Sequence, residues 1–342
     1  MNASRHTFES RRNPIVERSE RGAILVVVLW VVLALAMIAI SFAASVREEV
    51  AAARGLVDIK QSYYYARAGI SYSIYQIMRS RMMQATPEER LQKRAPDPVA
   101  LGRLRLDLAG GFADVEVLDE TGKLNINFVP ADMLLALLIN VGIPPGDADI
   151  LVDSIDDWRD PDDEHRLNGA ENEYYMTLEK PYLTKNTQVD VPEELLLVRG
   201  MTPEYFYGKK TMVNGQPMEL YGLSRYLTTF TNMNRINANS ASIPVLMSIP
   251  GMDQAAAETI VRERRQTPFS ESTDFAQQLP LQLSPNVMGL LSSFPSNVFS
   301  LVASGGVSNS RARSVIRCVF IVENNNPRGY RILYWNENNL EI

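Results

Sequence analysis

The sequence predicts an α+β protein: a long N-terminal transmembrane helix, then an antiparallel sheet domain into which a large α-helical domain is inserted. Three observations carry this prediction. An apolar run follows a charged leader, alternating segments occur before residue 122 and after residue 296, and leucine-rich helical patterns fill the interval between them. A chain of 342 residues is long enough for two domains beyond a membrane helix.

The N-terminal helix is expected over residues 23–85. Residues 23–44 carry no charge, and at a rise of ~1.5 Å per residue they span ~30 Å, the thickness of a bilayer core. The leader, residues 1–22, holds five arginines against three glutamates, which predicts that it stays in the cytoplasm. The helical pattern continues past Ala44 as an amphipathic stripe from Tyr63 to Met78, so a cleaved secretory signal fits less well.

The sheet domain is expected in two separate stretches of sequence. Residues 86–122 contain a loop over 86–98 followed by alternating strands at 104–108 and 112–119. Residues 296–342 contain strands at 298–303, 313–322 and 330–335. If these strands pair with one another, residues 123–295 form a helical domain inserted within the sheet domain.

The inserted domain contains an internal repeat. Residues 123–142 and 235–251 each begin with a basic residue, an aliphatic residue and Asn-x-Asn, then continue into a leucine-rich helix and a turn glycine. A second helix follows each time, at 147–158 and 253–265, which gives two units that resemble helix-hairpin-helix motifs. We expect the Asn, Ser and Thr oxygens to cap the first turns of the helices.

Helix-hairpin-helix motifs often grip DNA phosphates through backbone amides, but these units are better read as packing units. The first turn contains Pro144 and Pro145, which lack amide donors. The neighbouring sequence is acidic, and the whole chain carries a net charge of −6. Nucleic acid is therefore not an expected partner.

An acidic stretch between the repeats, residues 153–175, predicts an ion site. Pro161, Asn168 and Gly169 bend this stretch so that its carboxylates converge, and Trp158 and the Tyr174-Tyr175 pair anchor its ends. Converging carboxylates repel unless a cation lies among them, and hard oxygen ligands suit calcium. The loop is not an EF-hand, because counting from Asp160 puts His165 where glycine is required.

No disulfide within the chain can stabilise this fold. Cys318 is the single cysteine, which excludes an intramolecular disulfide. We therefore expect stability to come from core burial or from bound ions.

The N-terminal helix resembles that of the type IV pilin and pseudopilin families. A charged leader ending in Gly22 precedes an apolar helix, which implies cleavage by prepilin peptidase between Gly22 and Ala23 and methylation of the new terminus. Most members carry glutamate at the fifth mature position, which is Val27 here. Further matches to the minor pseudopilin K family of type II secretion are Gly122–Asn127, Asp157–Glu164, Gly169–Tyr175, Glu194–Gly200 and Ile236–Asn239.

This resemblance implies a pilin-like α/β domain with an inserted helical domain. It implies an inner-membrane protein whose C-terminal domain lies in the periplasm, at the tip of a pseudopilus, without a reaction of its own. The implied partners are the minor pseudopilins I and J, the major pseudopilin fibre and prepilin peptidase. It also implies calcium, with ligands from Asp160, Asp162, Asp163 and Glu171, followed by Asp157 and Glu173.

Two alternatives stay open at this point. Asp190, Glu193 and Glu194 begin the next helix, where a helix dipole favours acids without any ion. A membrane-anchored periplasmic hydrolase using the acidic loop 157–173 is the alternative function, because two carboxylates suffice for glycoside hydrolysis.

Overall fold

The computed structural model describes residues 17–82, 102–213, 216–232, 235–269, 275–294, 296–323 and 325–337. The chain forms two compact units, an N-terminal unit of residues 1–60 and a C-terminal unit of residues 61–342. The C-terminal unit holds the sheet and the inserted domain, so both are described together below.

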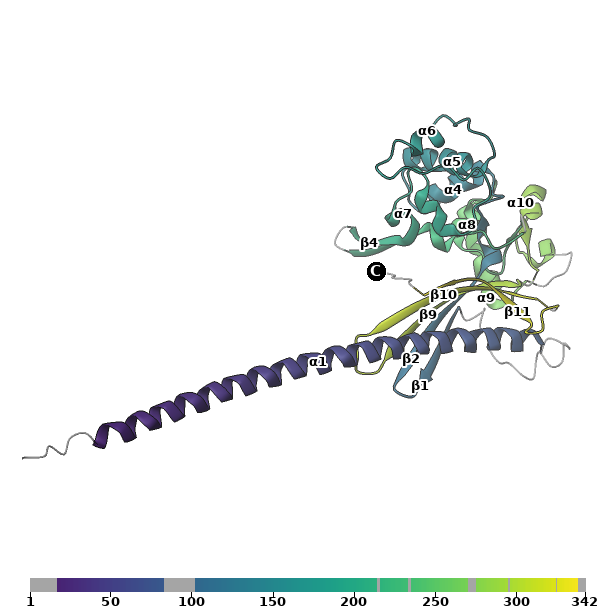
Figure 1. Ribbon diagram of the computed structural model, residues 1–342. Helices are drawn as coiled ribbons and strands as arrows, with labels where there is room; N and C mark the ends of the chain where they lie inside the picture. The colour runs from purple at the N-terminus through teal and green to yellow at the C-terminus, as the bar shows by residue number, and fades with distance from the viewer. Residues whose placement is uncertain are drawn as a thin grey trace, which may run out of the picture. The chain divides into compact units, whose positions relative to one another are not determined.

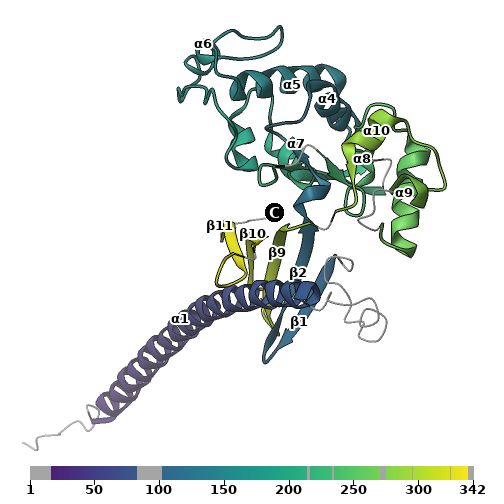
Figure 2. The same ribbon diagram turned by 90° about the vertical axis from the view of Figure 1, so that its right-hand side faces the viewer.

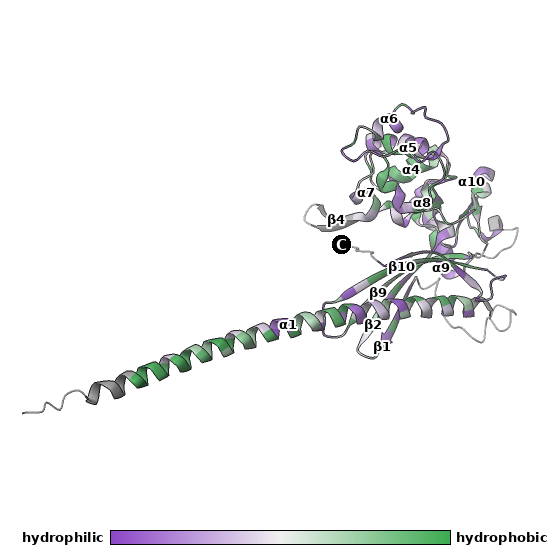
Figure 3. Ribbon diagram, viewed as in Figure 1, coloured by the Kyte–Doolittle hydropathy of each residue, from purple (hydrophilic) through white to green (hydrophobic). Residues whose placement is uncertain are grey.

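Helix α1 (Glu17–Met82) runs through the N-terminal unit and continues into the C-terminal one. In the N-terminal unit this helix is hydrophobic (Figure 3), and its large apolar side chains from Ile24 to Phe42 are exposed. Within the described part of the chain, this helix alone is long and apolar enough to cross a membrane, a match of length and composition. The expected end of the helix at residue 85 and the loop over 86–98 lie outside the described residues.

Five antiparallel strands form the sheet of the C-terminal unit, in the order β1-β2-β9-β10-β11 (Figure 1). The predicted strands are thereby confirmed, and the chain leaves the sheet after β2 and re-enters it at β9. The bounds are β1 Arg103–Leu108, β2 Gly111–Asp119, β9 Val298–Val307, β10 Arg313–Val322 and β11 Tyr330–Asn336.

One face of the sheet packs against the second half of α1. Ala66, Ile70 and Ile77 of the helix are buried with Val115, Leu301 and other aliphatic and aromatic side chains of the strands. Glycine permits the close approach, because a Cβ built on Gly305 would lie 1.9 Å from the carbonyl oxygen of Ser62. The periodic stripe predicted from Tyr63 to Met78 is therefore the face of α1 that covers the sheet.

The inserted domain lies against the other face of the sheet (Figures 1 and 2). It contains more strand than the sequence predicted, because β4 and β5 form an antiparallel hairpin within it. Its helices and 3-10 turns are η1 Glu120–Gly122, α4 Ala131–Asn140, α5 Pro145–Arg159, α6 Asn172–Tyr175, η2 Pro192–Leu197, α7 Pro203–Tyr207, η3 Leu223–Arg225, α8 Ile243–Met247, α9 Gln254–Gln266, η4 Phe275–Gln278 and α10 Pro285–Leu290. Its strands are β3 Leu124–Asn125, β4 Gly208–Val213, β5 Gln216–Tyr221, β6 Leu227–Thr228, β7 Ile236–Asn237 and β8 Leu291–Ser292.

The structural repeat contains one more element than the repeat predicted from the sequence, a returning strand at its end. In the first repeat, β3 leads into α4 and α5 and pairs in parallel with β6; in the second, β7 leads into α8 and α9 and pairs in parallel with β8. Each returning strand has the same turn, in which the hydroxyl of Thr228 or Ser292 accepts a bond from the backbone N–H of the phenylalanine two residues on. The inserted domain is thus built from two copies of one strand-hairpin-strand unit.

The expected role of the asparagines was wrong. The cap residues of α4 and α8 are Pro130 and Ser242, and neither makes a side-chain capping bond. Asn127 instead exchanges two bonds with the backbone of Val189, and Asn239 does the same with Phe269. These amides pair with an extended segment elsewhere in each repeat, a distant contact that local capping patterns do not reveal.

Candidate functional site

The acidic stretch lies in the connection that most clearly distinguishes the two repeats. Residues 160–226 join α5 to β6 in the first repeat, whereas residues 267–290 join α9 to β8 in the second. The acidic loop opens the longer connection, and α6 follows it at the end of the inserted domain away from the sheet (Figures 1 and 2). The site therefore belongs to an elaboration of the first repeat.

Aromatic side chains anchor the base of this loop, as predicted. Trp158 and Tyr175 are buried, and their rings meet edge to face with centroids 5.4 Å apart. Tyr182 packs on Tyr175 at 5.2 Å, and the indole N–H of Trp158 donates to Glu194 Oε1 at 3.0 Å. These contacts hold the end of α5 and the end of α6 in fixed positions.

Asp157 and Asp160 share one cation supplied by the protein itself. The guanidinium of Arg166 donates from Nη1 to Asp157 Oδ1 and to Asp160 Oδ2, both at 2.6 Å. Asp157 is fully buried, and its Oδ2 would lie 1.8 Å from a Cβ built on Gly169. Gly169 is thus required for the loop to close over Asp157, a role beyond the bend predicted for it.

Asp162 and Asp163 bind groups of the loop. Asp162 Oδ1 accepts the backbone N–H of Glu164 at 2.9 Å. Asp163 Oδ1 accepts from the amides of Asn172 at 2.8 Å and Asn186 at 3.0 Å. Of the six predicted ligands, Glu173 is exposed on α6.

Four side-chain oxygens around this loop are buried without a hydrogen-bond partner. They are Asp160 Oδ1, both carboxylate oxygens of Glu171, and Asn186 Oδ1. Leaving such acceptors unpaired costs about 1–3 kcal/mol for each group, and more when the group is charged. A cation among these oxygens would satisfy them.

The electrostatics of Glu171 point the same way. Burial raises the pKa of its carboxyl to about 7, and the negative charges of Asp157, Asp160 and Asp163 add to the rise. Glu171 is 4% exposed. Asp157, Asp160 and Asp163 therefore lie close enough to Glu171 to disfavour its negative charge.

The residues fit a calcium ion in chemistry, although the carboxylates stand apart in this arrangement. Within the described ranges, no three His, Cys, Asp or Glu side chains converge closely enough to hold a metal. The unpartnered set combines carboxylate and amide oxygens, the donors that calcium prefers. Asn186 was not predicted as a ligand from the sequence. In the structure its backbone is left-handed, with φ of 48°.

The three acids beyond the loop have structural roles. Glu194 accepts from Trp158 and pairs with Lys185 at 2.8 Å, and Lys185 also pairs with Asp190 at 2.7 Å. Glu193 pairs with Arg317 of β10 at 2.7 Å. Glu193 and Glu194 both lie in the first turn of η2.

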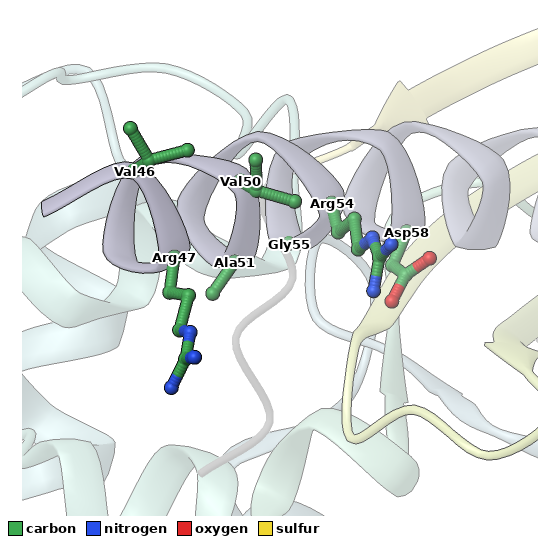
Figure 4. Close-up of a pocket in the computed structure, with 7 residues that line it drawn as sticks. All are labelled: Val46, Arg47, Val50, Ala51, Arg54, Gly55 and Asp58. Atoms are coloured by element: carbon green, nitrogen blue, oxygen red, sulfur yellow. The ribbon is translucent and has the colours of Figure 1, made fainter. Parts of the chain in front are cut away.

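The predicted cleavage point and a surface hollow lie on α1. The backbone of Gly22 and Ala23 is helical. Further along the N-terminal unit, Ala51 and Gly55 leave a hollow between longer side chains (Figure 4). The hollow is lined by Val46, Arg47, Val50, Ala51, Arg54, Gly55 and Asp58.

Models of known protein families match the two repeats of the inserted domain separately. A family model described as type II secretion system protein K, first part, matches residues 116–209, and a second model of protein K matches residues 236–291. The chain belongs to the type II secretion protein K family. The first match covers the acidic loop and the start of the first repeat, and the second covers the second repeat.

Individual relatives carry the same family name. The chain is 28% identical to type II secretion system protein K of Aeromonas hydrophila over 191 residues, 54% of this chain and 55% of that one. It is 22% identical to protein K of Pseudomonas aeruginosa over 279 residues, 77% and 78% of the two chains. A 77-residue match to a putative protein K of Escherichia coli (strain K12) is 38% identical and covers 22% of this chain and 24% of that one. The match thus spans about half of the Aeromonas protein and about a quarter of the Escherichia coli one.

The fold is that of a solved protein K. A chain in the crystal structure of the GspK-GspI-GspJ complex from enterotoxigenic Escherichia coli matches with a TM-score of 0.59 at 18% identity. The match covers 83% of this chain and 98% of that one. This likeness confirms the α+β fold class, with its N-terminal helix, antiparallel sheet and insertion.

Proposed function

We propose that this protein is a minor pseudopilin that forms the tip of a type II secretion pseudopilus together with pseudopilins I and J. The observation that carries the proposal is the shared build: an apolar N-terminal helix, a five-stranded sheet and a duplicated insertion, which match a protein K solved in a complex with two other subunits. The role is mechanical, because a tip subunit supports export by assembly.

The membrane part of the proposal rests on α1. The helix is delivered to the inner membrane with its leader in the cytoplasm, prepilin peptidase cuts between Gly22 and Ala23, and the C-terminal unit lies in the periplasm. The basic leader supports this orientation. Val27 supports a tip position, because a subunit with no neighbour above it has no partner for a buried glutamate at that place.

The exposed face of α1 in the C-terminal unit is the proposed surface for pseudopilins I and J. Tyr64 and Tyr75 are 61% and 57% exposed, and they lie on the same side of the helix as the exposed Arg67 and Arg79. Residues 59–82 contain no Asp or Glu. Large aromatic side chains with unopposed arginines suit a partner helix that carries carboxylates.

Co-purification tests this assignment. Pseudopilins I and J from the same genome are co-expressed with the full chain, and Arg67→Glu combined with Arg79→Glu is expected to lower recovery of the complex at least about tenfold. Arg328→Glu, an exposed charge reversal on the turn before β11, serves as the matched control. Undiminished recovery of the double variant would reject this surface, and no complex with the unaltered chain would reject the tip role.

We also propose that the acidic loop binds calcium through Asp160, Glu171 and Asn186, with Asp163 beside them. Their unpartnered oxygens support the proposal. Calcium supplies positive charge that the loop otherwise lacks beyond Arg166, and the residues themselves orient their oxygens and shield the ion. Titration calorimetry should give one or more sites in the range of about 10⁻⁴–10⁻³ M that Glu171→Gln weakens.

A further inference from the structure

The sheet and the inserted domain have separate hydrophobic cores. One core contains α1 and sheet residues such as Ile70, Leu301 and Phe320, and the other lies entirely within residues 124–291. Because the two domains share no apolar core, burial of apolar surface contributes little to holding them together. The position of one domain on the other must then depend on specific polar contacts.

Two ion pairs cross this junction from different points of the inserted domain. Arg225 in η3 donates from Nη2 to Glu116 Oε1 of β2 at 2.6 Å. Glu193 in η2 accepts from Arg317 Nη1 of β10 at 2.7 Å. β2 and β10 lie on either side of β9, so the two pairs hold the inserted domain at two separate places across the sheet.

A third pair lies where the chain passes from the sheet into the inserted domain. Lys123 donates to Glu120 Oε1, and both side chains are almost completely buried. Burial lowers the pKa of Lys123, and the nearby positive charges of Arg317 and Arg225 lower it further against the effect of Glu120. These six side chains form a network of charges in which Lys123 lies within electrostatic range of both Arg225 and Arg317.

Other contacts at the junction also favour one orientation of the inserted domain on the sheet. The Asn237 amide of the second repeat donates to Asp119 Oδ2 at the end of β2 at 3.1 Å. The guanidinium of Arg317 lies 5.8 Å from the ring centroid of Tyr334, which also meets Phe230 of the inserted domain at 5.9 Å. Separating a largely buried pair such as Glu193–Arg317 leaves an uncompensated charge, so the pair favours the orientation in which its partners meet.

We propose that this network is a latch that fixes the orientation of the inserted domain, and that breaking the Glu193–Arg317 pair lets the domain swing on its two connections to the sheet. Those connections are the passage from β2 through η1 into β3 and the passage from β8 to β9. Each domain keeps its own hydrophobic core when the pair is broken, so the latch opens without unfolding either domain. This inference concerns the chain alone and does not depend on the proposed assembly.

Pulsed electron resonance distance measurement tests the latch in the full chain in detergent micelles. Spin labels are placed by Arg311→Cys in the turn between β9 and β10 and by Glu179→Cys in the inserted domain, both exposed positions, while the native Cys318 is buried. Glu193→Arg and Arg317→Glu are each expected to widen the distance distribution about twofold, and the two together are expected to restore the narrow distribution.

Two further variants keep the test decisive. Glu193→Gln removes the charge with little change of shape, so it reports on the latch even where a charge reversal prevents folding. Asp149→Arg, which reverses an exposed charge on α5, is the matched control and should leave the distribution unchanged. A distribution as narrow in Glu193→Gln and in both reversals as in the unaltered protein, with circular dichroism confirming their fold, would overturn the proposal.

Discussion

The two repeats of the inserted domain share a frame but differ in what the frame carries. Each has an arginine in the last turn of its second helix that donates to two backbone carbonyls in the segment after the first strand: Arg159 to those of Ile126 and Val129, and Arg264 to those of Ala238 and Ala241. These contacts occupy equivalent positions. The arginine therefore belongs to the architecture of the unit.

The acidic loop, in contrast, belongs to the first repeat alone. It begins directly after Arg159, where the second repeat has the short connection after Arg264. The shared residues therefore hold the fold of both repeats, while the acidic loop and its proposed calcium site occur in the first repeat. Equivalent substitutions of the shared residues should thus lower stability by the same amount in either repeat. Substitutions in the acidic loop should instead change the proposed calcium binding.

The largest expected effect comes from removing a frame arginine. Arg264→Ala leaves the carbonyls of Ala238 and Ala241 unpaired inside the domain and should lower the free energy of unfolding by about 3 kcal/mol. Arg159→Ala should cost a similar amount, with calcium present or absent. Chemical denaturation followed by circular dichroism measures both, and a loss below about 0.5 kcal/mol in either would show that the repeats do not share this support.

The paired asparagines should give the next largest effect. Asn239→Ala removes two hydrogen bonds to Phe269, and Asn127→Ala removes two to Val189. Each substitution should cost about 2 kcal/mol because buried backbone groups lose their partners. The same denaturation experiment tests the equality, and a large effect at only one position would break the comparison between the repeats.

Glu171 should make the stability of the first repeat depend on pH. Its pKa is raised to about 7 in the folded protein from 4.5, so the folded state holds a proton that the unfolded state has lost. Without calcium, stability should fall as pH rises from 4.5 to 7 and then level off. Saturating calcium or Glu171→Gln should remove that fall, and a fall that persists in Glu171→Gln would assign it to another group.

The smallest effect is expected at the tip of the acidic loop. Leu167 is 94% exposed, so Leu167→Ser should change stability by less than about 0.5 kcal/mol and leave calcium affinity unaltered. Comparing melting temperatures with and without calcium provides the measurement. A marked loss of affinity would mean that the loop rearranges around the ion to bury this side chain.

Local patterns predicted the sheet, the hairpins and the anchoring aromatics, because alternation and helical spacing reflect which face of an element is buried. They could not predict that Asn127 reaches Val189, or that Arg166 lies between Asp157 and Asp160, because these contacts depend on how distant segments meet. The β4–β5 hairpin was missed for a different reason: the prediction treated the whole insertion as helical. Asn186 became visible only through its unpartnered oxygen.

The central claim, that this member of the protein K family is a processed minor pseudopilin, is tested most directly by the mass of the membrane-extracted protein. The full chain is expressed with and without prepilin peptidase and analysed intact by mass spectrometry. The account predicts loss of residues 1–22 only when the peptidase is present, with Ala23 as the new terminus. An uncut chain, or cleavage near Ala44, would contradict it.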